Sequence, residues 1–208
     1  MGGSLIGRRS VVAAAGAAGA LAAGRALAQA GPAKPRVELK TGMGVIVAEL
    51  EADKAPITCA NFLRYAQPGH HDGAHFFRAS RTEGAPTTGL IEGRLLTNTA
   101  KLLPPIKHES TTQTGLKHLD GTLSMARGAL DSARIDFFVC IGPAPYLDAD
   151  PTQPGDNLGY AAFGQVVEGM DVVRAILALP TPGKATNPDM QGQILDPPVA
   201  ILGMRKMT

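Results

Sequence analysis

Residues 121–148 of the chain read GTLSMARGALDSARIDFFVCIGPAPYLD. Two short apolar runs, Thr122–Ala126 and Phe137–Ile141, stand in this stretch on either side of a polar segment. Short β-prone runs that are broken by Gly, Pro and Asp are typical of strands in a small all-β domain. The stretch therefore predicts two strands of a mainly β fold.

Further strands and two helices are expected on both sides of this stretch. Strands are expected at residues 36–40 and 45–50, from His75, and at 160–167 and 199–204, and helices from Pro56 to Ala66 and at 172–177. Asp53 is the expected cap of the first helix, and Pro56 suits its first turn. Residues 79–105, 148–159 and 180–198 are expected to be irregular, because Gly, Pro, Thr and polar residues are scattered through them.

These elements fit one domain over residues 36–206 that contains roughly seven or eight strands. The strands do not alternate with helices, which disfavours a doubly wound parallel sheet. Closing the sheet on itself would remove its exposed edges. We therefore expect a closed antiparallel eight-stranded barrel with two helices capping its ends. With three Tyr, six Phe and no Trp, the core is expected to be mainly aliphatic.

Several motifs in this framework resemble the cyclophilin-type peptidyl-prolyl cis-trans isomerases. They are Lys54–Thr58 with Asn61-Phe62, Asp72-Gly73 with Phe76-Phe77-Arg78, Gly121–Ala126, Phe137-Phe138, Leu147-Asp148 and Phe163–Val173. The order of elements is similar to that family from Val37 to Met204. The resemblance implies a cyclophilin-like fold and an enzyme that rotates X-Pro bonds of proteins to assist their folding, without a cofactor.

The resemblance also implies roles for single residues. Arg78 stands at the catalytic arginine position of the family, Phe138 matches the aromatic floor of the proline pocket, and Leu147 matches a further wall. Ala126 and Arg127 match positions that contact the backbone of the bound peptide. Arginine suits the catalytic task, because a charged donor aimed at the imide nitrogen favours the twisted transition state.

The segment after Arg78 departs from the family pattern. The differences are Gly89 in place of a pocket Phe, Leu90 in place of Met, Glu92 and Asp136 in place of Gln, and Tyr160 in place of a frequent His. Leu90 and Tyr160 are still expected to line the pocket. Losing an aromatic wall at Gly89 is expected to weaken proline binding by about 1.5–3 kcal/mol.

Two arrangements of the acids Glu92 and Asp136 remain open. In the first, both contact the peptide or pair with Arg78, which would fix its guanidinium but occupy its donors and slow the reaction. In the second, other arginines balance the acids and leave Arg78 available. The arginines in question are Arg81, Arg94, Arg127 and Arg134.

Other functions are weighed against the isomerase. The main alternative is a module of the same fold that binds proline peptides or acts as a chaperone with little turnover, and a third possibility is a scaffold. Glu92 and Asp136 could also form a glycosidase-type pair of carboxylates. The absence of Trp and the few aromatics disfavour a sugar cleft.

Residues 1–30 are expected to be a twin-arginine export signal, followed by a linker at 31–35. Arg8-Arg9 precedes an Ala/Gly-rich stretch, and Ala28-Gln29-Ala30 suits cleavage after Ala30; an uncleaved anchor or a tail is the alternative. Without the three arginines of this segment the formal charge falls from +2 to −1, which gives no support to nucleic-acid binding. We expect a periplasmic or exported monomer without a membrane segment, acting on proline-containing polypeptides.

Two small groups of side chains invite a structural role. Cys59 and Cys140 are expected to be buried free thiols, with a disulfide as the alternative in an oxidising compartment. His70, His71 and His75 have a spacing that can bind zinc on a helix, but they lie in an expected turn. We therefore expect solvated histidines and no metal.

Overall fold

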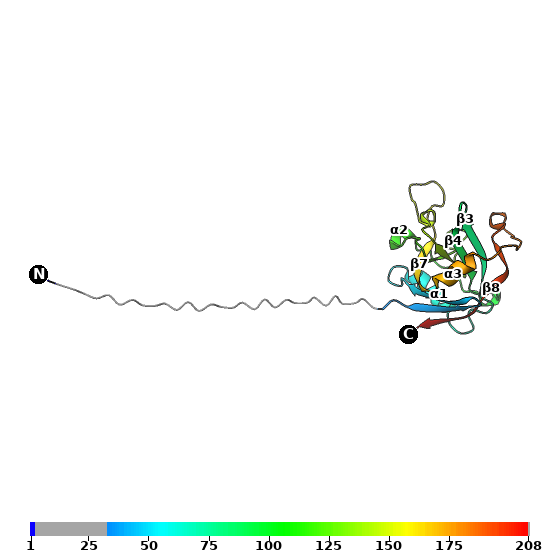
Figure 1. Cartoon of the computed structure of the whole chain (residues 1–208), viewed down its shortest axis with the longest axis horizontal. Helices are drawn as coiled ribbons and strands as arrows, with labels where there is room; N and C mark the ends of the chain where they lie inside the picture. The colour runs from blue at the N-terminus through cyan, green and yellow to red at the C-terminus, as the bar shows by residue number, and fades with distance from the viewer. Residues whose placement is uncertain (3–32, 208) are drawn as a thin grey trace. The chain divides into compact units, whose positions relative to one another are not determined.

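The structure is a computed structural model that describes residues 1–2 and 33–207 (Figure 1). The expected export signal falls on residues 3–30 outside this range, so its prediction is not addressed by the fold. Among the described residues, no helix is long and apolar enough to cross a membrane.

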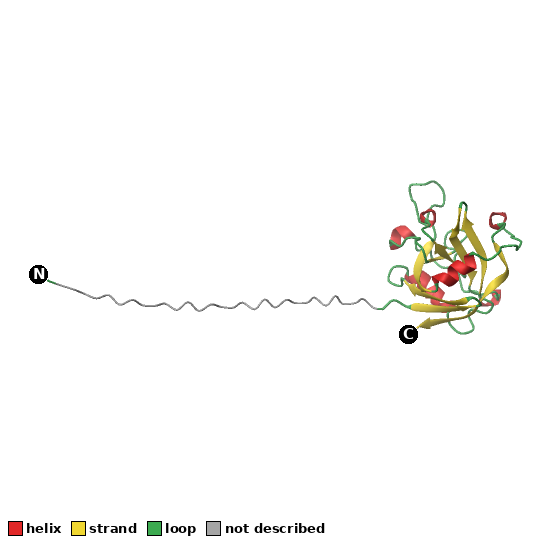
Figure 2. Cartoon of the chain, in the orientation of Figure 1, coloured by secondary structure: helices red, strands yellow, loops and turns green. Residues whose placement is uncertain are grey.

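Eight strands close into a barrel in the order β1-β2-β7-β5-β6-β4-β3-β8, and every neighbouring pair is antiparallel. The strands are β1 (Arg36–Thr41), β2 (Gly44–Leu50), β3 (His75–Thr82), β4 (Ala85–Arg94), β5 (Thr122–Met125), β6 (Asp136–Ile141), β7 (Ala161–Glu168) and β8 (Ile194–Met207). Figure 2 shows the strands wrapped around a common centre. The predicted eight-stranded antiparallel barrel is confirmed.

Both predicted helices are present. They are α1 (Pro56–Tyr65), with Pro56 in its first turn as expected, and α3 (Met170–Leu177). A four-residue helix, α2 (Thr111–Thr114), and three short 3-10 turns, η1 (Thr99–Lys101), η2 (Pro145–Leu147) and η3 (Pro188–Met190), lie in the connections and were not predicted. The barrel therefore has three α-helices rather than two.

The N-terminus of α1 is bonded to a distant carboxylate. Glu109 accepts hydrogen bonds from the backbone N–H of Ile57 at 3.1 Å and of Thr58 at 2.8 Å, and from the Thr58 hydroxyl at 2.7 Å. The prediction that Asp53 caps this helix is wrong, because no side-chain cap is made locally. A carboxylate at a helix N-terminus satisfies free N–H groups and opposes the helix dipole favourably.

The segment expected to be irregular after Arg78 is a β-hairpin. Strands β3 and β4 continue through it and pair as far as Thr82 and Ala85, which leaves Glu83 and Gly84 as a two-residue turn. Gly84 has a φ of 72°, a conformation that tight hairpin turns require. The tip is exposed on both faces, so it lacks the apolar alternation by which a strand is recognised.

Strand β8 begins earlier than expected, at Ile194 rather than near Val199. Ile194 pairs with Arg78, while the next pair of this ladder is Val199 with Phe76, so the intervening residues bulge out of the ladder. Pro197 and Pro198 lie in this bulge, where a missing N–H does not break a ladder hydrogen bond. The two prolines are the reason why the strand was not predicted to begin before Val199.

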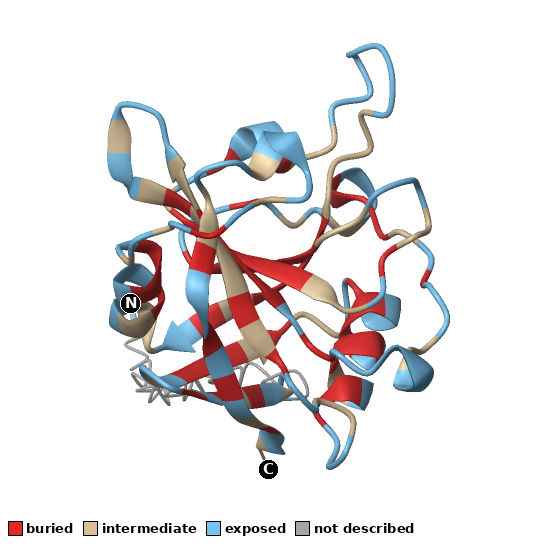
Figure 3. Ribbon diagram, turned by 90° about the vertical axis from the view of Figure 1, so that its right-hand side faces the viewer, coloured by how far each residue is buried: buried red, intermediate tan, exposed pale blue. Residues whose placement is uncertain are grey.

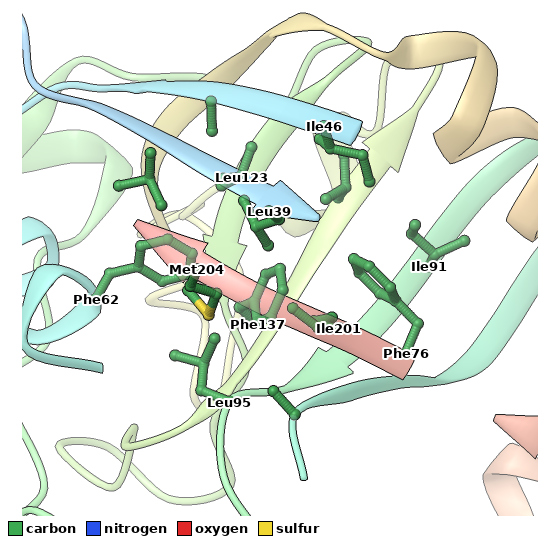
Figure 4. Close-up of a cluster of buried hydrophobic side chains, with 14 of the residues drawn as sticks. Leu39, Ile46, Phe62, Phe76, Ile91, Leu95, Leu123, Phe137, Ile201 and Met204 are labelled. Atoms are coloured by element: carbon green, nitrogen blue, oxygen red, sulfur yellow. The ribbon is translucent and has the colours of Figure 1, made fainter. Parts of the chain in front are cut away.

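The barrel encloses one large hydrophobic core (Figures 3 and 4). Its residues are mainly aliphatic by number, as expected, but four phenylalanine rings run through it. Ring centroids lie 5.1 Å apart for Phe62 and Phe163, 5.4 Å for Phe62 and Phe137, and 5.6 Å for Phe76 and Phe137. These contacts tie α1 to strands β3, β6 and β7.

Both cysteines are buried and free, which confirms the expected thiols over a disulfide. Cys59 lies on α1 and donates to the carbonyl of Phe163 at 3.3 Å, whereas Cys140 lies on β6. Burial raises the pKa of each thiol to about 12. The thiols therefore stay protonated and act as small buried apolar side chains.

Candidate active site

The candidate site lies on the outer face of the barrel wall at strand β6. Successive side chains of a strand point to opposite faces. Phe137 belongs to the barrel core, while Phe138 belongs to a separate cluster with Cys140, Ala144 and Leu147. One strand thus supplies both the core and the floor of a pocket outside it.

One row of residues across the sheet brings the site together. Ser124 on β5 is paired with Phe138 on β6, Phe138 with Glu92 on β4, and Glu92 with Arg78 on β3. Residues that lie directly opposite on neighbouring strands share one face of the sheet. The register therefore sets Arg78 and Phe138 on one face of the sheet, with strand β4 between them.

A cavity of about 250 Å³ opens over this row. It is lined by Arg78, Ser80, Leu90, Glu92, Ala126, Arg127, Phe138, Tyr146, Leu147, Tyr160 and Met190. Eight of these are residues that the sequence predicted to form the site, including Leu90 and Tyr160. Ser80, Tyr146 and Met190 were not among the predicted residues, and Met190 comes from the Pro-rich segment before β8.

Asp136 lies apart from this cavity. It is paired in register with Arg94, whose Nε and Nη2 donate to its two carboxylate oxygens at 2.7 and 2.9 Å. It borders a neighbouring hollow beside Arg134 and Ala126 instead. The expectation that Asp136 pairs with Arg78 is corrected, because the residue directly opposite on β4 already engages the carboxylate.

Arg78 is bonded to two acceptors from different segments. Its Nη1 donates to Oε2 of Glu92 at 2.8 Å, and its Nε donates to Oε1 of Gln193 at 2.8 Å. The Glu92 side chain is 8% exposed and that of Arg78 is 19% exposed. Burial raises the pKa of Glu92, and its hydrogen bond from Arg78 opposes this rise only in part. The first arrangement of the acids thus holds for Glu92, and the second holds for Asp136.

Aromatic rings surround Phe138 on two sides. The ring of Tyr160 meets it edge-to-face at 5.4 Å, and the imidazole of His118 stacks on it at 5.9 Å with an angle of 17°. The guanidinium of Arg127 lies over the Tyr160 ring at 5.6 Å. Edge-to-face, stacked and cation–π contacts of this geometry stabilise the position of the Phe138 ring.

His118 supports the floor from behind and was missed by the sequence reasoning. Its Nδ1 lies 2.7 Å from Oδ1 of Asp148, and its Nε2 lies 2.9 Å from the Ser124 hydroxyl. The ring is fully buried, and this burial lowers the pKa of His118 against the opposing pull of Asp148. Asp148 lies 30 positions from His118 in the chain, so no local motif marks this pair.

The side chain of Arg127 is committed to the loop at 148–159. Its Nη1 and Nη2 donate to the carboxylate of Asp156 at 2.6 and 2.9 Å, and its Nε donates to the carbonyl of Gly159 at 2.9 Å. Arg127 therefore does not balance Glu92, and it ties the long polar loop to the rim of the pocket.

Gly89 does not occupy a pocket wall. Gly89 lies on β4, where it pairs with Arg81 of β3 and Ile141 of β6. Its φ is 140°, and a Cβ at this position would lie 2.0 Å from the carbonyl oxygen of Ser80. A phenylalanine is therefore excluded at this position by the backbone. Tyr146 and Met190 supply side-chain walls to the cavity instead.

The histidines near the start of β3 make local contacts. The His71 Nδ1 lies 3.2 Å from the carbonyl oxygen of Tyr65, and the His75 Nδ1 lies 2.7 Å from that of Gly73. Within residues 1–2 and 33–207, no three His, Cys, Asp or Glu side chains gather in a way that could hold a metal ion.

The fold and this site have counterparts in known proteins. The chain resembles two crystal structures of a cyclophilin type peptidyl-prolyl cis-trans isomerase from Cryptosporidium parvum. One superposes with a TM-score of 0.65 at 18% identity, covering 84% of this chain and 98% of that one. The other, determined in the presence of the dipeptide Ala-Pro, has a TM-score of 0.64 at 20% identity, covering 83% and 99%.

Sequence comparison gives the same grouping. A peptidyl-prolyl cis-trans isomerase of Acinetobacter baylyi is 38% identical over 72% of this chain and 75% of its own length. The isomerase cyp18 of Streptomyces antibioticus is 35% identical over 76% of this chain and 92% of its own length. Residues 36–198 match the family model described as cyclophilin type peptidyl-prolyl cis-trans isomerase/CLD. The chain therefore belongs to the cyclophilin-type peptidyl-prolyl cis-trans isomerases.

Proposed function

We propose that the chain isomerises X-Pro bonds at the cavity over strand β6, with Phe138 beneath the proline ring and Arg78 as the catalytic donor. The observation that carries this proposal is that one cavity is lined by both the buried aromatic floor and the guanidinium. Leu147 and Leu90 add apolar walls. This composition matches a substrate with one apolar ring next to a polar imide bond.

The chemistry needs only positioning and one charged donor. Amide resonance resists rotation about the X-Pro bond with a barrier of about 18–20 kcal/mol. In the twisted transition state the imide nitrogen regains its lone pair. A donor that bonds to this lone pair stabilises the transition state more than it stabilises either ground state. A guanidinium offers several N–H donors in a fixed planar geometry, so Arg78 can serve as this donor.

The guanidinium of Arg78 retains donors for this task. Of its five N–H groups, the one on Nε serves Gln193 and one on Nη1 serves Glu92. Within residues 33–207, no acceptor is bonded to Nη2. Nη2 is therefore the donor that we assign to the imide nitrogen.

The test is the isomerisation rate of a short Ala-Pro peptide with the protein and with Arg78→Ala. We expect the variant to lose about a hundredfold or more in rate, as removal of a transition-state donor does elsewhere. Arg94→Ala is the matched control, because Arg94 bonds to Asp136 outside the cavity. An Arg78→Ala variant that is folded and as fast as the parent would overturn the assignment.

A proline-peptide binding module with little turnover is the second candidate. The observation in its favour is the carboxylate of Glu92, which neutralises part of the charge of Arg78. Peptide binding without rate enhancement in a folded protein would favour this candidate. Rate enhancement that depends on Arg78 would exclude it.

We also propose that the protein works as a monomer outside the cytoplasm, on proline-containing segments of exported proteins. The support is the sequence Arg8-Arg9 followed by an apolar stretch and Ala28-Gln29-Ala30. Cell fractionation with N-terminal sequencing of the recovered protein tests the location and cleavage after Ala30. Cytoplasmic protein with an intact N-terminus would contradict it.

A further inference from the structure

Gln193 links the segment before β8 to the proposed catalytic arginine. Its Oε1 accepts the hydrogen bond from Nε of Arg78 at 2.8 Å, although 115 positions separate the two residues in the chain. Gln193 is half-buried and directly precedes Ile194, the residue paired with Arg78 in the β3–β8 ladder. The side chain thus approaches Arg78 from a segment that carries none of the other residues of the row.

The side-chain amide of Gln193 has only one orientation that satisfies both of its contacts. Its Nε2 donates to the carbonyl oxygen of Asp189 at 3.1 Å. A guanidinium only donates and a carbonyl only accepts, so the amide oxygen must face Arg78 and the amide nitrogen must face Asp189. The amide therefore connects the backbone of Asp189 to the guanidinium of Arg78 through two hydrogen bonds.

The backbone of Gln193 is fixed as well. Its carbonyl accepts from the N–H of Ala79 at 2.9 Å, and its N–H donates to the carbonyl of Met190 at 3.0 Å. Ala79 is the residue after Arg78, so the segment is attached to β3 beside the catalytic position. Met190, from the same turn, lines the cavity.

Two acceptors in two directions define the plane of a guanidinium. Glu92 binds Nη1 from β4, and Gln193 binds Nε from the start of β8. With either acceptor alone, the group could turn about the remaining hydrogen bond. Gln193 adds this constraint without a second negative charge, so it orients Arg78 and leaves its positive charge in place.

We propose that Gln193 is a positioning residue for the isomerase reaction, fixing the plane of the Arg78 guanidinium so that Nη2 points at the imide nitrogen. This inference rests on the proposed function of Arg78. Gln193 does not line the cavity itself, whereas the apolar walls bind the proline ring independently of it. Loss of the amide should therefore affect turnover and leave substrate affinity nearly unchanged.

The first experiment compares kcat and KM of Gln193→Ala with those of the parent on an Ala-Pro peptide. We expect kcat to fall about tenfold, with KM changed less than about twofold. Gln191→Ala is the matched control, because Gln191 is exposed on the same segment and makes no side-chain hydrogen bond among residues 33–207. A folded Gln193→Ala protein with parental kcat would overturn the proposal, as would a rise in KM that accounts for the whole loss.

A second variant, Gln193→Glu, separates positioning from a structural role. Its carboxylate would keep an acceptor for Nε but add a negative charge beside Arg78 and face the Asp189 carbonyl. We expect its kcat to fall at least as far as that of Gln193→Ala, because the new carboxylate offsets the charge of Arg78 and repels the carbonyl of Asp189. Parental kcat in a folded Gln193→Glu protein would count against the proposal even if Gln193→Ala failed to fold.

The outcome for Gln193 can be told apart from that of the proposed function. If the parent protein gives no rate enhancement, or if Arg78→Ala keeps it, the function of Arg78 fails first. If the parent is active and Arg78→Ala is not, then normal kcat in Gln193→Ala removes the positioning role alone. NMR of the Arg78 Nε–H adds a readout without turnover: we expect this proton to exchange faster with solvent in Gln193→Ala than in the parent, and equal exchange would contradict the proposed hydrogen bond.

Discussion

The carboxylate of Glu92 and the guanidinium of Arg78 form an ion pair directly across the β3–β4 ladder, with Nη1 and Oε2 2.8 Å apart. Because both side chains are mostly buried, solvent screens the pair only weakly. The pair orders the guanidinium, and it also offsets the charge that the transition state would use. Glu92 therefore both supports and restrains the proposed catalyst.

Replacing Glu92 by Gln should raise the isomerisation rate. The amide oxygen of Gln can still accept from Nη1, whereas the negative charge is lost, so the variant keeps the geometry and strengthens the donor. We expect a gain of about two- to tenfold in kcat/KM on an Ala-Pro peptide. Glu83→Gln is the control, because Glu83 is exposed at the hairpin tip. An unchanged rate for Glu92→Gln would remove the restraining role.

The advantage of Glu92→Gln should also depend on pH. Burial raises the pKa of Glu92 above its ordinary value of 4.5, so the Glu92 carboxylate of the parent protein is protonated at a higher pH than an exposed Glu would be. A neutral Glu92 no longer offsets Arg78. The rate ratio of variant to parent should therefore be largest above neutral pH and approach one on acidification. A ratio that stays constant would show that the charge of Glu92 is irrelevant.

Acidification should destabilise the fold through His118. Burial lowers the pKa of His118 below 6.5, so the unfolded chain binds a proton at this position at a higher pH than the native chain does. Its contribution is therefore fully present above about pH 6.5 and is lost as the pH falls through the lowered native value. Denaturant unfolding at several pH values should show a weaker pH dependence for His118→Gln than for the parent. His75→Gln, half-buried at the start of β3, serves as the control.

Removing the distant cap of α1 should cost more than removing the nearest acid in sequence. Glu109→Ala takes away the acceptor of three hydrogen bonds and leaves the buried N–H and hydroxyl of Thr58 without this partner. We expect a loss of about 2 kcal/mol in the free energy of unfolding. Asp53→Ala, by contrast, should change it by less than about 0.5 kcal/mol. The reverse order in chemical denaturation would restore Asp53 as the cap.

The two thiols should be unreactive in the native protein. Cys59 and Cys140 are buried, and their raised pKa values keep them in the thiol form, which is a poor nucleophile. A thiol reagent at about pH 8 should label neither residue until denaturant is added, and then both. Rapid labelling of the folded protein would show that one of the two sites opens readily.

The parts of this fold that the sequence predicted are those with a local pattern. Short apolar runs such as Phe137–Ile141 mark strands because each is buried along its whole length. The β3–β4 hairpin escaped this reasoning, because its tip projects beyond the core and buries neither face. The start of β8 escaped it for another reason, since Pro197 and Pro198 lie in a bulge that only the paired strand reveals.

The site follows the same division. Arg78 and Phe138 were predicted because the motifs around them resemble a known family, and the register then sets them in one row. Met190, Gln193 and His118 reach the site through contacts between segments far apart in the chain, which no local spacing encodes. The partner of Asp136 stayed open between Arg78 and other arginines, because a sequence does not show which strand will lie beside it.

The alternation of Phe137 and Phe138 along β6 has a consequence for how this protein can change. The barrel wall is a single β-sheet, and Phe137 and Phe138 belong to separate clusters on its two sides. Substitutions among the residues packed on the outside can reshape the cavity without disturbing the interior that makes the chain fold. The shape of the cavity and the packing that supports folding are thus separately adjustable traits, encoded at alternate positions of the same strand.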